Sequence, residues 1–129
     1  MKKEDVTVLI VDDSEHIRAL FAVTLKKLGI GTVVMASNGE EGVEQFQKTN
    51  PSIVFLDNLM PKMNGLEALS RMRELRPDAV VVMLSAVTSI EVVKEAKERG
   101  ASFYLVKPYT QAKVVEIIQK FLNVEGLTP

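Results

Sequence analysis

IVFLDNLMPKMNG, residues 53–65, is a run of four apolar side chains that ends at an aspartate and continues through a proline to a glycine. The apolar run is too short for a helix and too uniformly apolar for a half-exposed strand, so it indicates a strand covered on both faces. Asp57 then stands at the carboxyl end of this strand. Asn64 and Glu67 predict the capped start of a helix. Taken alone, Asp57 fits a turn residue as well as a site residue.

The composition is that of an ordinary globular protein: 47% of the 129 residues are hydrophobic and 26% are charged. Lysine and arginine number 16 against 17 aspartate and glutamate, and this net charge of -1 argues against a nucleic-acid surface. The absence of cysteine excludes disulfides and thiolate metal sites, and a single histidine argues against a histidine-rich zinc site. The first residues lack a signal-peptide core. We therefore expect a cytoplasmic protein that binds neither nucleic acid nor membrane.

Short apolar runs alternate with segments of helical periodicity along the chain. The predicted strands are residues 6–11, 32–36, 53–56, 79–84 and 102–106. The predicted helices are residues 14–28, 38–50, 65–76 and 88–100 and the segment that begins at Thr110. Such alternation predicts a doubly wound α/β fold, with a parallel sheet covered by helices on both faces.

Capping residues and apolar faces support these helices. The candidate caps are Asn38 with Glu41, Asn64 with Glu67, Ser89 or Thr88, and Thr110. The third helix is expected to bury Ala68, Leu69, Met72 and Leu75, and the last to bury Val114, Ile117, Ile118 and Phe121. Residues 125–129 are expected to fray.

Polar side chains stand at the carboxyl end of four of the predicted strands. Asp12 and Asp13 follow the first strand, Asp57 ends the third, Ser85 ends the fourth and Lys107 ends the fifth. Ligands of doubly wound sheets bind outside this edge. Each residue alone has a simpler explanation as a cap, a strand-end hydroxyl or a surface lysine, but all five on one edge indicate a site.

Three converging carboxylates raise one another's pKa or require a cation. Oxygen ligands without histidine or cysteine favour magnesium, with manganese possible. Lys107 and the hydroxyl of Ser85 suit an anion bound at the same place. Together these groups indicate phosphoryl transfer, with the carboxylate of Asp57 able to form an acyl phosphate.

Four motifs carry a resemblance to a known family: LIVDDS at 9–14, FLDNLMPKMNG at 55–65, MLSA at 83–86 and YLVKP at 104–108. With them the chain resembles the receiver domains of bacterial two-component response regulators, specifically the stand-alone, chemotaxis-type (CheY-like) members. The resemblance implies a flavodoxin-like, five-stranded parallel sheet of order 2-1-3-4-5. It also implies one receiver domain over residues 1–129, with a core at about 6–122 and no output domain.

The resemblance implies roles for the site residues. Asp57 accepts the phosphoryl group from a sensor histidine kinase or a phosphotransfer domain. Asp13 and Asp57 bind magnesium directly, Asp12 binds it largely through water, and the backbone carbonyl of Leu59 supplies another ligand. Lys107 pairs with a phosphoryl oxygen.

The resemblance also implies a switch, in which Ser85 moves towards the phosphoryl group on Asp57 and Tyr104 turns into the vacated space. Pro108 is expected to follow a cis peptide bond. An unknown output protein would read the face of the fourth helix, fifth strand and fifth helix. The candidate contacts on that face are Tyr104, Lys94, Lys97, Tyr109 and Lys113.

The helix after Ser14, with Ile17 and Arg18, would meet the phosphodonor. The protein is expected to be a signalling phosphoprotein, not a turnover enzyme, and either a monomer or a phosphorylation-dependent dimer. Tyr104 could instead be a static aromatic. His16 is expected to be exposed and not catalytic.

Three other functions are weighed against this one. A phosphatase of the haloacid dehalogenase type needs a second acid two residues after the nucleophile, where this chain has Leu59. A nucleotide-binding domain needs a glycine-rich first loop, whereas this one reads VDDSE. A pseudo-receiver, an interaction module that is not phosphorylated, stays open as the main alternative, although its usual sign is loss of the acids or the lysine.

Asn58, Leu59 and Val87 depart from the residues more often found in the family around the site. Because apolar side chains at 59 and 87 are poorly suited to orient a hydrolytic water, we predict a long-lived phosphoryl group. Phosphate release from purified phosphoprotein in magnesium would measure the lifetime, and fast loss would contradict the prediction.

Overall fold

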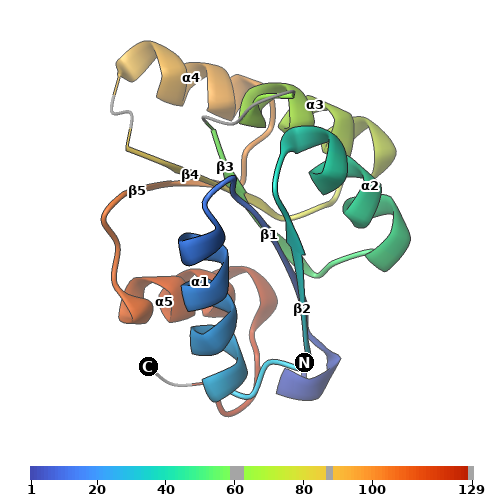
Figure 1. The fold of residues 1–129 in the computed structure, drawn as a ribbon, viewed down its shortest axis with the longest axis vertical. Helices are drawn as coiled ribbons and strands as arrows, with labels where there is room; N and C mark the ends of the chain where they lie inside the picture. Colours follow the sequence, from blue (N-terminus) through green and yellow to red (C-terminus); the bar gives the residue numbers. More distant parts are fainter. Residues whose placement is uncertain (59–62, 87–88, 128–129) are drawn as a thin grey trace.

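Five parallel strands form the centre of the computed structural model, which describes residues 1–58, 63–86 and 89–127 (Figure 1). The strands are β1 (Thr7–Val11), β2 (Thr32–Ala36), β3 (Ile53–Asp57), β4 (Val81–Ser85) and β5 (Phe103–Val106). The helices are α1 (Glu15–Lys27), α2 (Gly39–Thr49), α3 (Gly65–Leu75), α4 (Ile90–Glu98) and α5 (Gln111–Leu122), and a 3-10 turn, η1 (Lys3–Asp5), precedes β1. The sheet order is β2-β1-β3-β4-β5, which confirms the predicted fold.

The strands in the middle of the sheet are buried from end to end. Every residue of β3 and β4 is buried, as the uniformly apolar runs predicted. At the edge, β2 is largely exposed or half-buried. The apolar centre therefore holds the strand that ends at Asp57.

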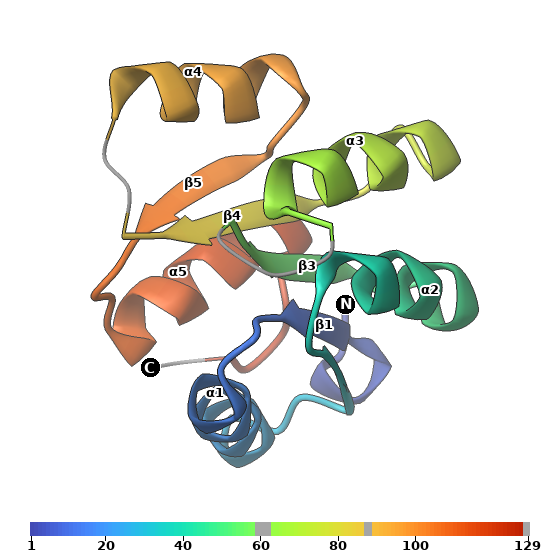
Figure 2. The ribbon, with the colours of Figure 1, turned by 45° about the horizontal axis from the view of Figure 1, so that its top comes forward.

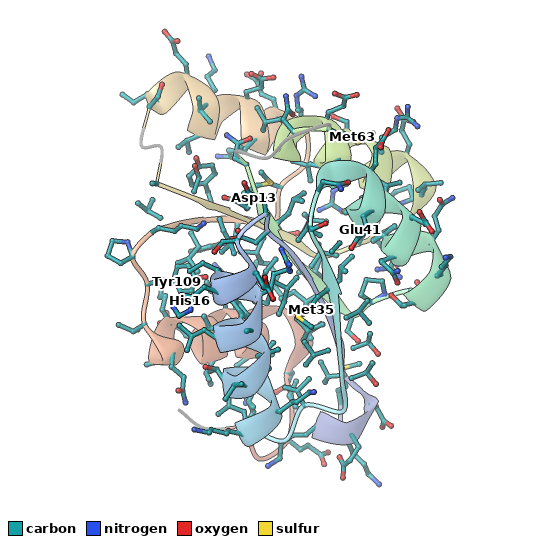
Figure 3. All side chains as sticks on the ribbon, viewed as in Figure 1. Asp13, His16, Met35, Glu41, Met63 and Tyr109 are labelled. Carbon is teal, nitrogen blue, oxygen red and sulfur yellow. The ribbon has the colours of Figure 1, made fainter. Side chains whose placement is uncertain are left out.

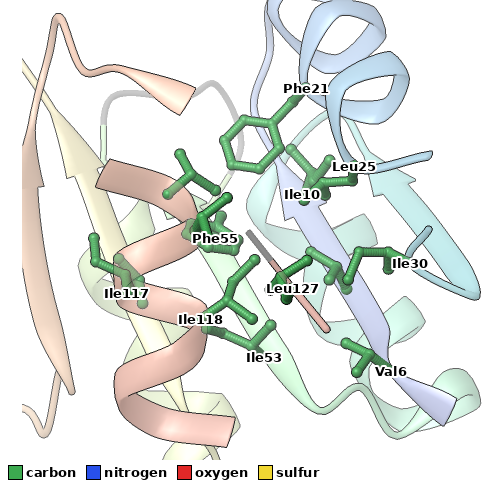
Figure 4. Packing of buried hydrophobic residues seen from close by; sticks show 14 of the residues in the cluster. Val6, Ile10, Phe21, Leu25, Ile30, Ile53, Phe55, Ile117, Ile118 and Leu127 are labelled. Atoms are coloured by element: carbon green, nitrogen blue, oxygen red, sulfur yellow. The ribbon is translucent and has the colours of Figure 1, made fainter. Parts of the chain in front are cut away.

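Helices cover the two faces of the sheet as separate layers. Figures 1 and 2 show α1 and α5 on one face and α2, α3 and α4 on the other. Side chains along β3 alternate between them: Ile53 and Phe55 join the α1–α5 side, while Val54 and Leu56 join the opposite side. Figure 4 shows Phe55 between Phe21 of α1 and Ile118 of α5.

Side-chain caps begin most of the described helices; those at Asn38, Asn64 and Thr110 were predicted from the sequence, and the one at Ser14 was not. An oxygen of each capping residue accepts a hydrogen bond from a backbone N–H in the first turn, in the pairs Ser14–Ile17, Asn38–Glu41, Asn64–Glu67 and Thr110–Lys113. The carboxylate of Glu41 reaches back to Ser37, one residue before the expected partner. Ser89 is the N-cap of α4 without a side-chain cap bond, and Thr88 lies outside the described residues.

Two expectations about packing are wrong. Leu75 is 48% exposed, because the buried face of α3 ends at Met72 and Leu75 is the last residue of the helix. The segment after α5 does not fray as far as residue 127: Val124 and Leu127 are buried, and the side chain of Gln119 donates to both of their carbonyls. Residues 128–129 lie outside the described part of the chain.

Nothing in the described helices has the length and apolar character that crossing a membrane would require.

We predict that the same substitution will have very different effects at two leucines of α3. Leu69→Ala removes a fully buried side chain and should lower the free energy of unfolding by about 2–5 kcal/mol. Leu75→Ala, the matched control, should change it by less than about 1 kcal/mol. Urea titrations would measure both, and equal losses would contradict the burial of α3 described above.

Candidate functional site

The carboxyl ends of adjacent strands bring the predicted site residues together. Asp57 lies opposite Leu84 in the pairing of β3 with β4, and Ser85 lies opposite Val106 in the pairing of β4 with β5. The backbone N–H of Lys107 continues this ladder by donating to the carbonyl of Ser85 at 2.9 Å. The edge of the sheet is thus built from backbone hydrogen bonds, which fix where each polar side chain begins.

Asp12, Asp13 and Asp57 form a cluster in which one carboxylate oxygen from each lies within 4.8 Å of the others. Asp12 and Asp57 are buried, with 1% and 6% exposure, whereas Asp13 is exposed. In Figure 3 Asp13 lies at the turn between β1 and the start of α1. Asp12 is held in place because its Oδ1 accepts the N–H of Ser14 at 2.9 Å. The cluster is therefore partly buried but open on one side.

Lys107 brings a single positive charge to these acids. Its Nζ lies 3.2 Å from Oδ2 of Asp12 and 3.3 Å from Oδ1 of Asp57. One ammonium among three carboxylates leaves the cluster with excess negative charge when all three are ionised.

Burial raises the pKa of Asp57 above its ordinary value. Lys107 opposes this effect, while the negative charges of Asp12 and Asp13 add to it. Burial alone would lower the pKa of Lys107, but the carboxylates of Asp57 and Asp12 outweigh it and raise the pKa. Lys107 is consequently a stable cation in this site.

The donor atoms of the cluster fit a hard divalent cation. All three residues offer carboxylate oxygens, which magnesium and manganese prefer, and their excess charge favours such an ion. The exposure of Asp13 leaves room for water in the coordination sphere. Leu59, expected to add a carbonyl oxygen, lies outside the described residues, as does Val87.

Two further predicted residues lie on the neighbouring strands β4 and β5. Ser85 is buried at the end of β4, with 1% exposure. Tyr104 lies in β5 opposite Met83, is half-buried, and packs against the core on the α2–α4 side. The Lys107–Pro108 peptide bond is cis, as predicted.

The residues expected on the partner face are spread over the surface. Lys94 and Lys97 are exposed on α4, and the ammonium of Lys113 lies over the ring of Phe103 and 3.6 Å from Glu116. Tyr109 instead packs against Phe21 of α1. Their roles in binding a partner stay predictions.

On α1, His16 is exposed as expected. Ile17 and Arg18 are half-buried, and the guanidinium of Arg18 donates to the backbone carbonyl of Asp12 at 2.8 Å. Arg18 therefore contacts the backbone of the site itself, and its meeting with a phosphodonor stays a prediction.

Sequence reasoning missed the part that Gly65 plays at the site. A Cβ on Gly65 would lie 2.3 Å from the backbone carbonyl oxygen of Asp57, too close for any other residue without a shift. The glycine lets α3 start directly against the end of β3. The sequence signal for this role was the glycine itself. A glycine was equally well explained by the loop expected between the third strand and the third helix.

The comparisons with known proteins agree with this geometry. The family described as the response regulator receiver domain matches residues 8–119. The chain is similar to the chemotaxis protein CheY of Thermotoga maritima, with 36% identity over 88% of this chain and 94% of that protein. It is 35% identical to the CheY of Bacillus subtilis, over 90% of this chain and 97% of that protein. A chain in the solved CheX-CheY-BeF3-Mg+2 complex from Borrelia burgdorferi superposes with a TM-score of 0.83 and 35% identity, covering 89% of this chain and 87% of that one.

Asp57→Asn should raise the free energy of unfolding near neutral pH, because it removes a buried charge from a cluster of like charges. With its pKa raised, Asp57 binds a proton more tightly in the folded than in the unfolded protein, so it costs stability as pH rises through the folded pKa. The gain should therefore be larger at about pH 7 than at about pH 4, where the carboxyl becomes protonated. Thermal unfolding in a chelator at both values would measure it.

The matched control is Asp78→Asn, since the side chain of Asp78 is 91% exposed. It should change stability little at either pH. A loss of stability at neutral pH in Asp57→Asn would contradict the dominance of burial over the attraction of Lys107.

Proposed function

The chain belongs to the response regulator receiver domain family, and we propose that it is a switch set by phosphorylation of Asp57. Response regulators of this kind are signalling proteins and not turnover enzymes. The observation that carries the proposal is the contact of the Lys107 ammonium with both Asp12 and Asp57. This contact gives the buried carboxylate of Asp57 a neighbouring cation without neutralising the whole cluster. Such an arrangement suits the transfer of an anionic phosphoryl group to an anionic carboxylate.

In the proposed reaction, a carboxylate oxygen of Asp57 forms a bond to phosphorus while the bond from phosphorus to the donor atom breaks. The donor atom keeps the electron pair. We propose a phosphohistidine of a sensor histidine kinase or phosphotransfer domain as donor, so that this atom is an imidazole nitrogen and a solvent proton leaves the imidazole neutral. The ammonium of Lys107 would stabilise the charge on a phosphoryl oxygen.

We propose magnesium, or manganese, as the cofactor. Asp13 and Asp57 would bind the ion directly, Asp12 largely through water, and the carbonyl of Leu59 would add a ligand. When bound, the ion supplies positive charge to the phosphoryl oxygens. Support comes from the cluster of acids, which offers only oxygen ligands. It comes also from the Borrelia complex, which contains a chain similar to this one together with Mg2+.

The signal would leave the site through Ser85 and Tyr104. Ser85 ends the strand next to β3, and we propose that its hydroxyl bonds a phosphoryl oxygen on Asp57; Tyr104 stands on the next strand along. A movement of these residues would change the surface of α4, β5 and α5, where Lys94, Lys97 and Lys113 would contact an output protein. The Borrelia complex contains a CheX and a CheY, which supports another protein as a binding partner. We propose that this happens in the cytoplasm, through one receiver domain acting as a monomer or a phosphorylation-dependent dimer.

The test is intact-mass spectrometry after incubation with acetyl phosphate and magnesium. We expect one phosphoryl adduct on the wild type, none on Asp57→Asn, and a strong decrease when a chelator removes magnesium. Asp78→Asn, which replaces an exposed aspartate, should be modified like the wild type.

If the folded wild type gains no adduct, the phosphorylation proposal is wrong and the pseudo-receiver is favoured. An adduct that persists in Asp57→Asn would instead move the acceptor to another residue.

A further inference from the structure

Three aromatic rings connect the site strand to the loop that carries Lys107. Phe55 of β3 lies two residues before Asp57, and its ring centroid is 4.9 Å from that of Phe21 in α1. The centroid of Phe21 is in turn 6.0 Å from that of Tyr109, in an edge-on contact. Phe21 and Phe55 are buried, so the inner two rings are fixed by the core. The third ring therefore attaches the segment after β5 to a rigid support.

A pocket next to Lys107 makes this attachment important. It has a volume of about 540 Å3 between α1 and the start of α5, and its lining includes Phe21, Lys107, Pro108 and Tyr109. Among the described residues, side chains leave this space open beside Lys107, so packing constrains the long lysine stem less on that side. The position of the ammonium therefore depends on its two carboxylate partners, Asp12 and Asp57, and on the backbone from which the stem extends.

That backbone is held on both sides of Lys107. Before the side chain, the N–H of Lys107 donates to the carbonyl of Ser85 at 2.9 Å. After it, Pro108 leads directly to Tyr109, whose ring packs against Phe21 and the core of the α1–α5 side. Loss of the ring would remove this contact with the core and leave the segment held by the strand before Lys107 and by the Thr110 cap at the start of α5.

We propose that Tyr109 is a positioning residue, whose ring holds Lys107 beside Asp57, 3.3 Å away in this structure, for the phosphorylation reaction. This inference rests on the proposed function. The role belongs to the ring and not to a charge. Burial, with the nearby negative charges of Asp12 and Asp57, raises the pKa of Tyr109 to about 12, so the phenol stays neutral at physiological pH.

A double-mutant cycle on the rate of phosphorylation by acetyl phosphate tests the inference. Tyr109→Leu keeps an apolar side chain but loses the ring, and should lower the rate about tenfold, as small misplacements of a catalytic group do. Tyr109→Phe should restore the wild-type rate. In a Lys107→Ala background, Tyr109→Leu should lower the rate no further, because the group it positions is gone.

Phe121→Leu is the matched control, since Phe121 is also half-buried and packs against the same core but lies at the end of α5. It should lower stability without changing the rate. Equal rate losses for Tyr109→Leu in both backgrounds would overturn the positioning role and leave a merely structural one, and so would a wild-type rate in Tyr109→Leu.

The proposed function and this inference fail separately. If the wild type is not phosphorylated at all, the proposed function falls and takes the inference with it. If the wild type is phosphorylated at Asp57 and the cycle shows no coupling, only the inference is wrong.

Discussion

The repulsion among three carboxylates, opposed by a single ammonium, is the constraint on which the site depends. Left to themselves, two of these side chains would not stay buried as charges, because burial penalises the ionised form. Lys107 compensates part of the negative charge of the three carboxylates but not all of it, so the site still favours the binding of positive charge. The same imbalance that costs folding free energy would favour a divalent cation there, and stability and function are therefore opposed at this edge of the sheet.

The rest of the fold supplies the stability that this edge does not. Every residue of β3 and β4 is buried, and the side chains of β3 contribute to the hydrophobic cores on both faces of the sheet. Because the core holds these strands, the residues at their carboxyl ends have fixed positions. Flexible loops alone could not position them in this way. Gly65 adds to this by letting α3 begin against the backbone of Asp57. The packing of the apolar centre thus compensates for the electrostatic repulsion among the acids at this edge of the sheet.

Sequence patterns predicted the fold well because each signal was local and repeated. Apolar runs gave the strands, caps such as Asn38 and Thr110 gave the helix starts, and the resemblance gave the strand order. The acid cluster followed from the topology, since parallel strands share an edge. The periodicity of α3 could not show that its buried face ends before Leu75. No local pattern revealed that the side chain of Gln119 hydrogen-bonds to the segment after α5. The ring contact of Tyr109 with Phe21 joins residues far apart in sequence, and only the folded packing reveals it.

The segment before β1 and the segment after α5 lie side by side. Lys2 forms a bridge with Glu125, and the N–H of Glu125 donates to the carbonyl of Met1 at 2.8 Å. Because Lys2 precedes β1, this junction is at the amino edge of the sheet, opposite the acids (Figure 1). A fluorescent protein fused before Met1 would thus leave the fold on the side away from Asp57 and keep the acid cluster unobstructed.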